Sequence, residues 1–154
     1  MCYYYENMKN PDALWYDLIV RIGQQSKCKS RQVGCLLILE NRIIGQGYNG
    51  APEGSNCDDC PRGKCKGENV PSGTDLHKAL CCHAEPNAIG YCARHGISTK
   101  GSTIYLPIPP CSECAKLIVA SGIVEVVYKD AYADDQFSLL ILKNAKINIR
   151  KFNI

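Results

Sequence analysis

A histidine and a glutamate separated by one residue, His83 and Glu85, are the first side chains with an evident chemistry. Further along the chain, Cys111 and Cys114 lie three residues apart and directly follow Pro110. One imidazole and two thiolates suit zinc, and three protein ligands leave the fourth tetrahedral position open, as in catalytic zinc sites. These residues predict a catalytic Zn2+ held by His83, Cys111 and Cys114.

Glu85 is the predicted proton carrier beside that zinc. From two residues past His83, its carboxylate can reach a zinc-bound water without becoming a metal ligand. Zinc lowers the pKa of such a water to roughly 7, and a neighbouring carboxylate can accept the proton and return it elsewhere. The expected chemistry is attack by activated water.

Two helices and one strand must position these groups. The pattern predicts a helix over 84–95 that stops at Gly96, a strand over 102–107, and a helix over 111–121 ended by Gly122. Residues three apart share a helix face, and a helix N-terminus stabilises the thiolate form of cysteine. Both helix N-termini can then meet at one end of a sheet, where α/β proteins place their sites.

Further elements are predicted around this unit. They are a helix from Pro11 to near Gly23, a hairpin made of residues 33–39 and the run after a turn at Asn41-Arg42, a strand at 123–129, a helix at 135–145 and a last strand at 146–152. Strands alternating with helices after residue 80 imply βαβ units, parallel pairing and a sheet covered on both faces. Residues 50–75, rich in Gly, Pro, Asp and Cys, predict an irregular insertion within one domain.

The composition is that of an ordinary globular chain, with 154 residues of which 45% are hydrophobic and 21% charged. A net charge of +3 without a run of five Lys or Arg calls for neither a nucleic acid polymer nor a membrane as partner. Without a signal-peptide pattern or a membrane-length apolar run, we expect a cytoplasmic protein. Disulfides are disfavoured there, so eleven cysteines indicate metal binding or, for Cys35 and Cys92, buried packing.

A structural zinc site is the alternative for the two cysteines after Pro110. The "CDDC" run at 57–60 could supply the other half of such a site. However, about fifty residues separate the two pairs, whereas structural zinc ribbons separate theirs by about 15–20. The joint pattern of histidine, glutamate and the proline-preceded cysteine pair therefore favours the catalytic site.

The spacing H-x-E…P-C-x-x-C is typical of zinc-dependent nucleobase deaminases. With "SKCKSRQVGC", "GYNGAPEG", "CHAEPNAI" and "TIYLPIPPCSECAKLIVASGIVEVVY", the chain resembles the deoxycytidylate (dCMP) deaminase family of the cytidine deaminase superfamily from residue 26 to 132. The resemblance implies an α/β fold, a three-layer α/β/α sandwich with a central mixed five-stranded sheet. Residues 1–154 would form one zinc deaminase domain with a Cys-rich insertion at about 50–80.

The same resemblance implies hydrolytic deamination of dCMP to dUMP and ammonia, which feeds dTMP synthesis. The zinc ligands and the proton shuttle of the family fall on the four residues predicted above. Its substrate-binding residues fall on Asn49, Ala84, Arg94 and Tyr132, and Arg94 is associated with the phosphate. From the residues alone, Asn49 could instead be the positive-φ residue of an Asn-Gly turn, Arg94 a solvated cation and Tyr132 a packing residue.

Regulation is also implied, because many members of the family are hexamers activated by dCTP and inhibited by dTTP. The expectation is an allosteric homohexamer, with Mg2+ accompanying the regulatory nucleotide. The "GYNGAPEG" loop is the expected effector contact, since glycine lets the backbone approach a triphosphate. Two other functions stay open: deamination of another cytosine nucleotide, such as dCTP or a 5-substituted dCMP, and a non-catalytic Cys-rich zinc-binding module.

Some relatives carry a second, structural zinc, and the resemblance places three of its ligands on Cys28, Cys57 and Cys81. His77 lies four residues before Cys81, so the two would share a helix face if the segment is helical. With His77 the set reaches four ligands, the number typical of a structural site. The alternatives are a replacement of one ligand by Cys60 or Cys65, or no second metal.

Overall fold

The computed structural model describes residues 11–71, 74–130 and 136–152. The described strands are β1 (Gly34–Leu39), β2 (Arg42–Tyr48), β3 (Thr103–Leu106), β4 (Glu125–Tyr128) and β5 (Asn148–Lys151). The described helices are α1 (Pro11–Gly23), α2 (Ala84–Arg94), α3 (Ser112–Ala120) and α4 (Gln136–Asn144), with short 3-10 helices η1 (Gly63–Lys66) and η2 (Leu76–Lys78). No helix among these residues is long and apolar enough to span a membrane.

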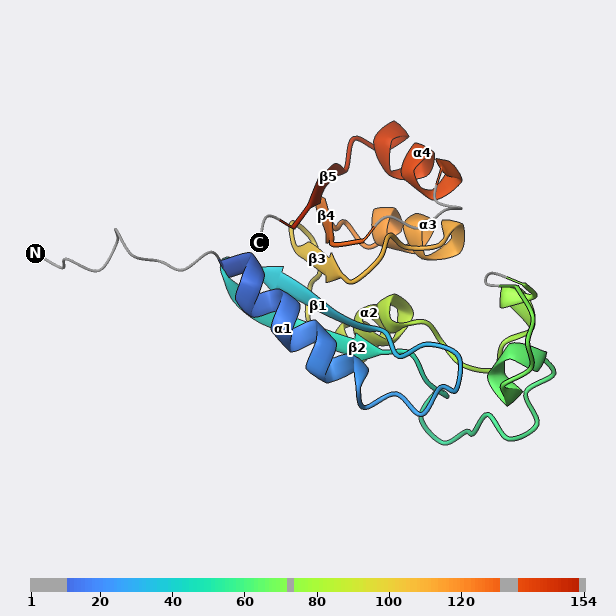
Figure 1. Cartoon of the computed structure of the whole chain (residues 1–154). Coiled ribbons are helices and arrows are strands. Elements are labelled where there is room, and N and C mark those ends of the chain that lie inside the picture. The colour runs from blue at the N-terminus through green and yellow to red at the C-terminus, as the bar shows by residue number, and fades with distance from the viewer. Residues whose placement is uncertain (1–10, 72–73, 131–135, 153–154) are drawn as a thin grey trace, which may run out of the picture.

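The five strands form one mixed sheet in the order β2-β1-β3-β4-β5 (Figure 1). β1 pairs antiparallel with both β2 and β3, whereas β3, β4 and β5 run parallel to one another. The parallel strands are connected through α3 and α4, because parallel pairing requires a crossover connection between consecutive strands. The predicted mixed five-stranded sheet is therefore confirmed, and so are the helices and strands that the sequence predicts around it.

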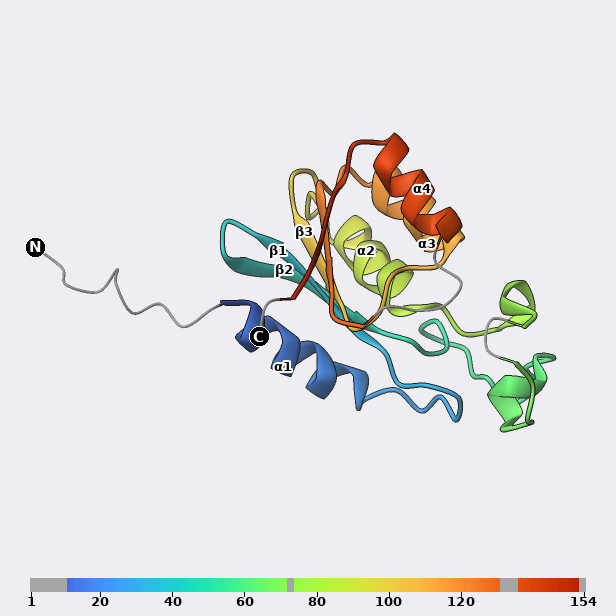
Figure 2. The ribbon, with the colours of Figure 1, turned by 45° about the horizontal axis from the view of Figure 1, so that its top comes forward.

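Helices cover both faces of the sheet, which makes three layers. Figure 2 shows α1 on one side and α2, α3 and α4 on the other. The strand β1 is buried along nearly its whole length for this reason: Leu36 and Ile38 pack with Trp15 and Ile19 of α1, whereas Leu37 packs with the residues of α2. Cys35 and Cys92, both with no exposed surface, belong to the α2 side, which confirms their predicted packing role.

Two glycines allow the helices to approach the strands closely. A Cβ atom on Gly47 of β2 would lie 2.3 Å from the carbonyl oxygen of Ala84 in α2, and one on Gly34 of β1 would lie 2.2 Å from that of Ile19 in α1. Both distances are shorter than real Cβ contacts, and the opposing atoms are backbone. The absence of a side chain at Gly47 thus allows α2, whose first turn carries Glu85, to lie close against β2.

The hairpin turn differs by one residue from the prediction. Its positive φ angles are those of Glu40 (50°) and Asn41 (59°), not of Asn41 and Arg42. Two successive residues with positive φ match a tight type I′ turn, and β1 and β2 then pair Leu39 with Arg42. The two turn residues are those whose backbone conformation matches the twist of the two strands.

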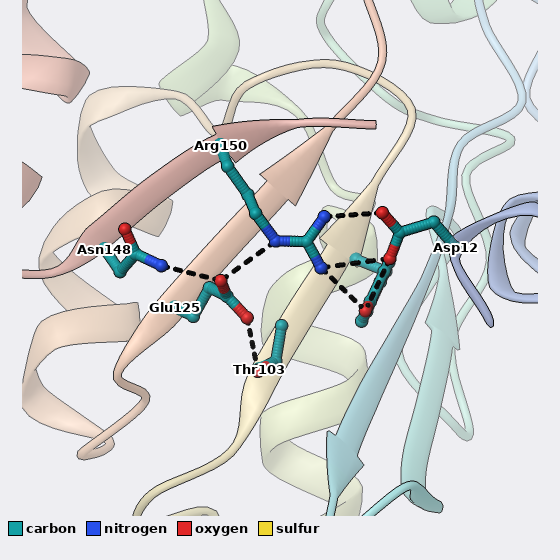
Figure 3. A network of polar contacts seen from close by, with 6 residues as sticks. Asp12, Thr103, Glu125, Asn148 and Arg150 are labelled. Carbon is teal, nitrogen blue, oxygen red and sulfur yellow. Dashed lines mark hydrogen bonds and ion pairs between the residues drawn. The ribbon is translucent and has the colours of Figure 1, made fainter. Parts of the chain in front are cut away.

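An ion network ties the first helix to the last strand (Figure 3). The guanidinium of Arg150 in β5 donates to both oxygens of Asp12 in α1, at 2.5 and 3.0 Å, and its Nε donates to Glu125 of β4 at 3.0 Å. The hydroxyl of Tyr105 in β3 donates to Asp12 at 3.0 Å. Burial, with Asp12 as the next cause, raises the pKa of Tyr105 to about 12. Arg150 thereby links α1, β3 and β4.

Replacing Arg150 by methionine should lower the free energy of unfolding by about 2 kcal/mol, a value reduced from that of fully buried pairs because the guanidinium is 35% exposed. The loss arises because the Asp12 carboxylate, only 7% exposed, is left without its cation. Urea unfolding measures the effect. Lys151→Met removes the same charge from the exposed neighbouring position, and an equal loss in both variants would contradict the role of the network.

Candidate metal centre

The metal centre lies where the N-termini of α2 and α3 meet beyond the sheet. His83 precedes α2 as its N-cap residue, and Cys111 precedes α3 in the same way. The Nδ1 atom of His83 lies 3.5 Å from the sulfur of Cys111 and 3.5 Å from that of Cys114. Among the described residues, these three form the one group whose possible ligand atoms all lie within 4.8 Å of one another.

The local sequence explains why the cysteines meet at a helix start. Strand β3 ends at Leu106, and two consecutive prolines, Pro109 and Pro110, keep the chain out of helix until α3 begins at Ser112. The carbonyl of Cys111 then accepts the N–H of Ala115 at 2.8 Å, which closes the first turn. Two cysteines three residues apart are placed on one side of that turn.

The electrostatics of the site favour a thiolate. The Cys114 thiol donates a hydrogen bond to Cys111 and lowers the pKa of Cys111 to about 4, with a further contribution from His83. The same bond raises the pKa of Cys114. The hydrogen bond with Cys111 also raises the pKa of His83. The thiolate form that Cys111 favours is the form in which cysteine binds a metal ion.

Glu85 lies in the first turn of α2 and is 5% exposed. Burial raises the pKa of its carboxyl, and the neighbouring His83 opposes the shift. It stands outside the group of three close ligand atoms. A carboxyl whose pKa is raised towards neutrality, next to a metal site but not part of it, is suited to accept and release a proton.

The three ligands fit a zinc ion by their chemistry and by their spacing. Zinc prefers thiolate sulfur and imidazole nitrogen, and tetrahedral coordination by three protein ligands leaves one position for an exchangeable group. The backbone has already brought the three ligand atoms within 4.8 Å of one another. Binding would require only that the protons leave the thiols and the imidazole.

A cavity of about 430 Å³ opens onto these residues. Its lining includes His83, Glu85 and Cys111, together with Asn49 and Ala84, two of the predicted substrate-binding residues. Its size falls in the range of small-molecule sites. Tyr132, one of the two remaining residues predicted near the substrate, lies outside the described residues.

Asn49 shapes the wall of this cavity. Its Oδ1 accepts the N–H of Val33 at 2.8 Å, and its Nδ2 donates to the carbonyl of Arg31 at 2.8 Å. Asn49 is 8% exposed and does not have a positive φ, so the alternative reading as the special residue of an Asn-Gly turn is wrong. Its side chain fixes the segment that carries Arg31 into the cavity.

Arg94 lies elsewhere. It is the last residue of α2, its side chain is 63% exposed, and it forms an ion pair with Glu53. It does not line the cavity described above. The geometry of the described chain therefore does not bring Arg94 together with Glu85, and its phosphate role stays a prediction.

The insertion gathers cysteines, although less tightly than the first site. Burial raises the pKa of Cys81 to about 12, and the neighbouring thiols that contribute are those of Cys65, Cys28 and Cys57. The condition under which His77 and Cys81 would share a helix face is not met. Helix η2 ends at Lys78, and Ala79 is extended with φ −69° and ψ 131°.

Sequence reasoning missed several residues of the cavity. Arg62 and Lys64 come from the insertion, and Phe137 and Ser138 come from the first turn of α4. No motif singles out these four positions. The one available signal was the irregular length of the insertion, which indicated a functional segment but not which residues it presents.

The chain is similar to known proteins in both sequence and structure. The sequence profile described as the cytidine and deoxycytidylate deaminase zinc-binding region matches residues 9–130. The chain is 37% identical over 142 residues to the deoxycytidylate deaminase of Saccharomyces cerevisiae, covering 92% of this chain and 45% of that protein. It is 39% identical over 135 residues to that of Mus musculus, covering 84% and 72%.

The chain thus spans less than half of the yeast relative, but most of some others. It covers 92% of the deoxycytidylate deaminase of Mycobacterium phage D29, with 38% identity over 122 residues that make up 76% of this chain. Among solved structures, the dCMP deaminase of cyanophage S-TIM5 in complex with dCMP and dUMP superposes with a TM-score of 0.74 and 27% identity. That match covers 95% of this chain and 100% of the other.

Proposed function

Since the chain belongs to the cytidine and deoxycytidylate deaminase family, we propose that it hydrolytically deaminates dCMP to dUMP and ammonia and that the dUMP feeds dTMP synthesis. The observation that carries the proposal is the close group of His83, Cys111 and Cys114 beside the buried carboxyl of Glu85. Three of these residues, His83, Glu85 and Cys111, line one cavity of nucleotide-binding size.

The three ligands would hold zinc, which supplies Lewis acidity and so makes water a nucleophile near neutral pH. Glu85 takes the proton of the attacking water and delivers it to N3 of the cytosine ring. It then takes the proton of the new C4 hydroxyl and passes it to the amino group, which leaves as ammonia while the C4 carbonyl of dUMP forms. Its burial at 5% exposure suits both steps, because burial raises the pKa of the carboxyl and so strengthens it as a proton acceptor.

The substrate would lie along the cavity with its base towards Glu85. Ala84, fully buried at the start of α2, would present backbone to the base, and Asn49 would support the wall beside it. The dCMP deaminase of cyanophage S-TIM5, solved in complex with dCMP and dUMP, supports a pyrimidine nucleotide as the ligand. We keep Tyr132 and Arg94 as further proposed contacts on the strength of the family resemblance.

A substrate panel tests the function. Zinc-loaded protein is incubated with dCMP, deoxycytidine, dCTP and 5-methyl-dCMP, and ammonia release is followed. dCMP should be the preferred substrate. Preference for dCTP or for the 5-substituted nucleotide would redefine the substrate, and absence of ammonia from all four would favour a non-catalytic zinc-binding module.

Regulation and assembly are proposed from the family resemblance. We propose a cytoplasmic homohexamer that dCTP activates and dTTP inhibits, with Mg2+ accompanying the regulatory nucleotide at the loop of residues 47–54. Steady-state kinetics decide the regulatory part. Hyperbolic dCMP saturation that neither triphosphate changes would contradict it.

We also propose a second zinc, held by thiols of the insertion rather than by His77. Cys28, Cys57 and Cys81 were predicted as ligands, and Cys65 is the neighbour that interacts with Cys81. Four thiolates would make a closed structural site and would supply order to a segment with little apolar core. Among the described residues, no three of these sulfurs lie as close together as the ligands of the first site, so the metal would draw them inward.

Metal analysis of purified protein should find two zinc ions per chain. Cys65→Ser should remove one of them and leave the other, whereas His77→Ala should retain both. A single zinc ion that Cys111→Ala removes completely would contradict the second site. Loss of one ion from His77→Ala and not from Cys65→Ser would restore the ligand set that the sequence predicts.

A further inference from the structure

The edge strand β2 and the residues just after it hold the start of α2. Beyond the end of β2, Gly50 pairs with Cys82 through two backbone hydrogen bonds of 3.1 and 2.9 Å. Cys82 directly precedes the predicted metal ligand His83. One turn into the helix, the Nδ2 atom of Asn87 donates to the carbonyl of Tyr48 at 2.7 Å. The chain is thus tied to the same strand both before and after the ligand.

Gly47 of β2 makes the closest approach to this first turn. A Cβ atom there would lie 2.3 Å from the carbonyl oxygen of Ala84 and 2.6 Å from the backbone nitrogen of Ala88. Real Cβ atoms essentially never come within 3.0 Å of another atom, and neither opposing atom is a side chain that could turn away. A side chain at position 47 would therefore force the first turn of α2 away from the sheet. Glu85 lies in that turn, and His83 directly precedes it.

The two halves of the metal centre depend on different parts of the fold. The helix α2, which brings His83 and Glu85, packs mainly on β2 and only slightly on α3. The helix α3, with Cys111 and Cys114 at its start, packs mainly on α4. The depth of α2 against β2 therefore determines how far the Nδ1 atom of His83 lies from the two sulfurs, each at 3.5 Å.

We propose that β2 positions the metal centre, with Gly47 as the principal positioning residue and the hydrogen bond from Asn87 to Tyr48 as a second tie. The inference rests on the proposed function where it concerns turnover. A Cβ atom at position 47 would displace the start of α2 by roughly 1 Å to regain ordinary contact. A misplacement of about 1 Å can cost on the order of 100-fold in rate, and groups behind metal ligands typically change metal affinity about 10- to 100-fold.

A general loss of stability is the competing explanation, and the chain offers a matched control. A Cβ atom on Gly34 of β1 would collide as severely, at 2.2 Å from the carbonyl oxygen of Ile19 and 2.6 Å from the backbone nitrogen of Gly23. Both opposing atoms belong to α1, on the opposite face of the sheet from α2 and α3 (Figure 2). Gly34→Ala should therefore destabilise the fold about as much as Gly47→Ala does, without moving the metal centre.

The test follows the zinc ion that Cys111→Ala removes. Competition with a chromophoric chelator should show that Gly47→Ala weakens the binding of this ion about 10- to 100-fold and that Gly34→Ala changes it less than about twofold. In the Co2+-substituted protein, the ligand-field absorption that depends on Cys111 should shift or lose intensity in Gly47→Ala alone. With zinc in excess, the kcat for dCMP should fall on the order of 100-fold in the same variant. Urea unfolding should give similar losses of stability for both variants.

Asn87→Ala covers the case in which Gly47→Ala does not fold. The side chain is half-buried and its loss removes a single hydrogen bond, so the fold should be kept while the affinity for this zinc falls about three- to tenfold. Wild-type affinity in Gly47→Ala, equal losses of affinity in Gly47→Ala and Gly34→Ala, or wild-type affinity in Asn87→Ala would each overturn the proposal. Zinc affinity and the Co2+ spectrum require no turnover, so ammonia release by the wild type tests the proposed function separately.

Discussion

Glu85→Gln should reduce deamination of dCMP about 1000-fold while the protein keeps its zinc. Glutamine has nearly the same shape as glutamate, so the packing around this 5%-exposed side chain is preserved. The amide, however, cannot take a proton from water and return it to the ring or to the amino group. Initial rates of ammonia release, with zinc content measured on the same samples, check the result.

Glu113→Gln is the matched control for that experiment. Glu113 lies in the first turn of α3 beside Cys114, but its side chain is 78% exposed and pairs with Lys116. The variant removes the same charge close to the site without touching the cavity lining, and should keep wild-type turnover. If Glu85→Gln retained more than about a tenth of the activity, or if both variants lost activity equally, Glu85 would not be the proton carrier.

Cys111→Ala should abolish turnover by removing the zinc of the first site. The variant leaves only His83 and Cys114 of the close group of ligand atoms, and two protein ligands do not retain zinc in competition with a chelator. Metal analysis after dialysis against a chelator should show one zinc ion fewer per chain than the wild type. Ammonia release should fall to the background rate.

The control for this loss is another cysteine that has no place in the site. Cys92 of α2 is fully buried, and its thiol donates to the carbonyl of Ile44 at 3.6 Å. Cys92→Ala should cost some stability through the cavity it leaves, but it should keep the zinc content and the activity of the wild type. Retention of zinc and turnover by Cys111→Ala would refute the ligand assignment.

The sheet and the helices were predictable because burial imposes a recognisable pattern of apolar residues on each of them. The run of residues 33–39 is apolar without alternation, as expected of a strand that is covered on both faces, and β1 is buried in that way. The metal centre was predictable because its ligands lie at two helix starts. His83 and Cys111 each precede a helix, and residues such as Pro110 mark helix starts in the sequence.

The positions of side chains within the insertion were not predictable, since no periodic pattern of apolar residues governs this segment. Arg62 and Lys64 are positioned by single hydrogen bonds to the carbonyls of Thr74 and Val70, and such bonds leave no pattern in the sequence. Whether His77 and Cys81 share a helix face depended on the segment being helical, and it is not, because the chain becomes extended at Ala79. Arg94 was singled out by the family resemblance, which matches a position at the end of α2 but does not show what lies opposite it.

The pairing of Asp12 with Arg150 also has a consequence for how the chain is made. The two residues are 138 positions apart, and at ribosomal rates the second follows the first by about 7–28 s. During that interval α1 can be complete while its anchor in β5 does not yet exist, and Trp15 and Ile19 lack part of the surface on which they pack. Contacts this distant in sequence slow folding. Until β5 emerges, α1 therefore lacks its ionic anchor, and the closure of the sheet is timed by its last described strand.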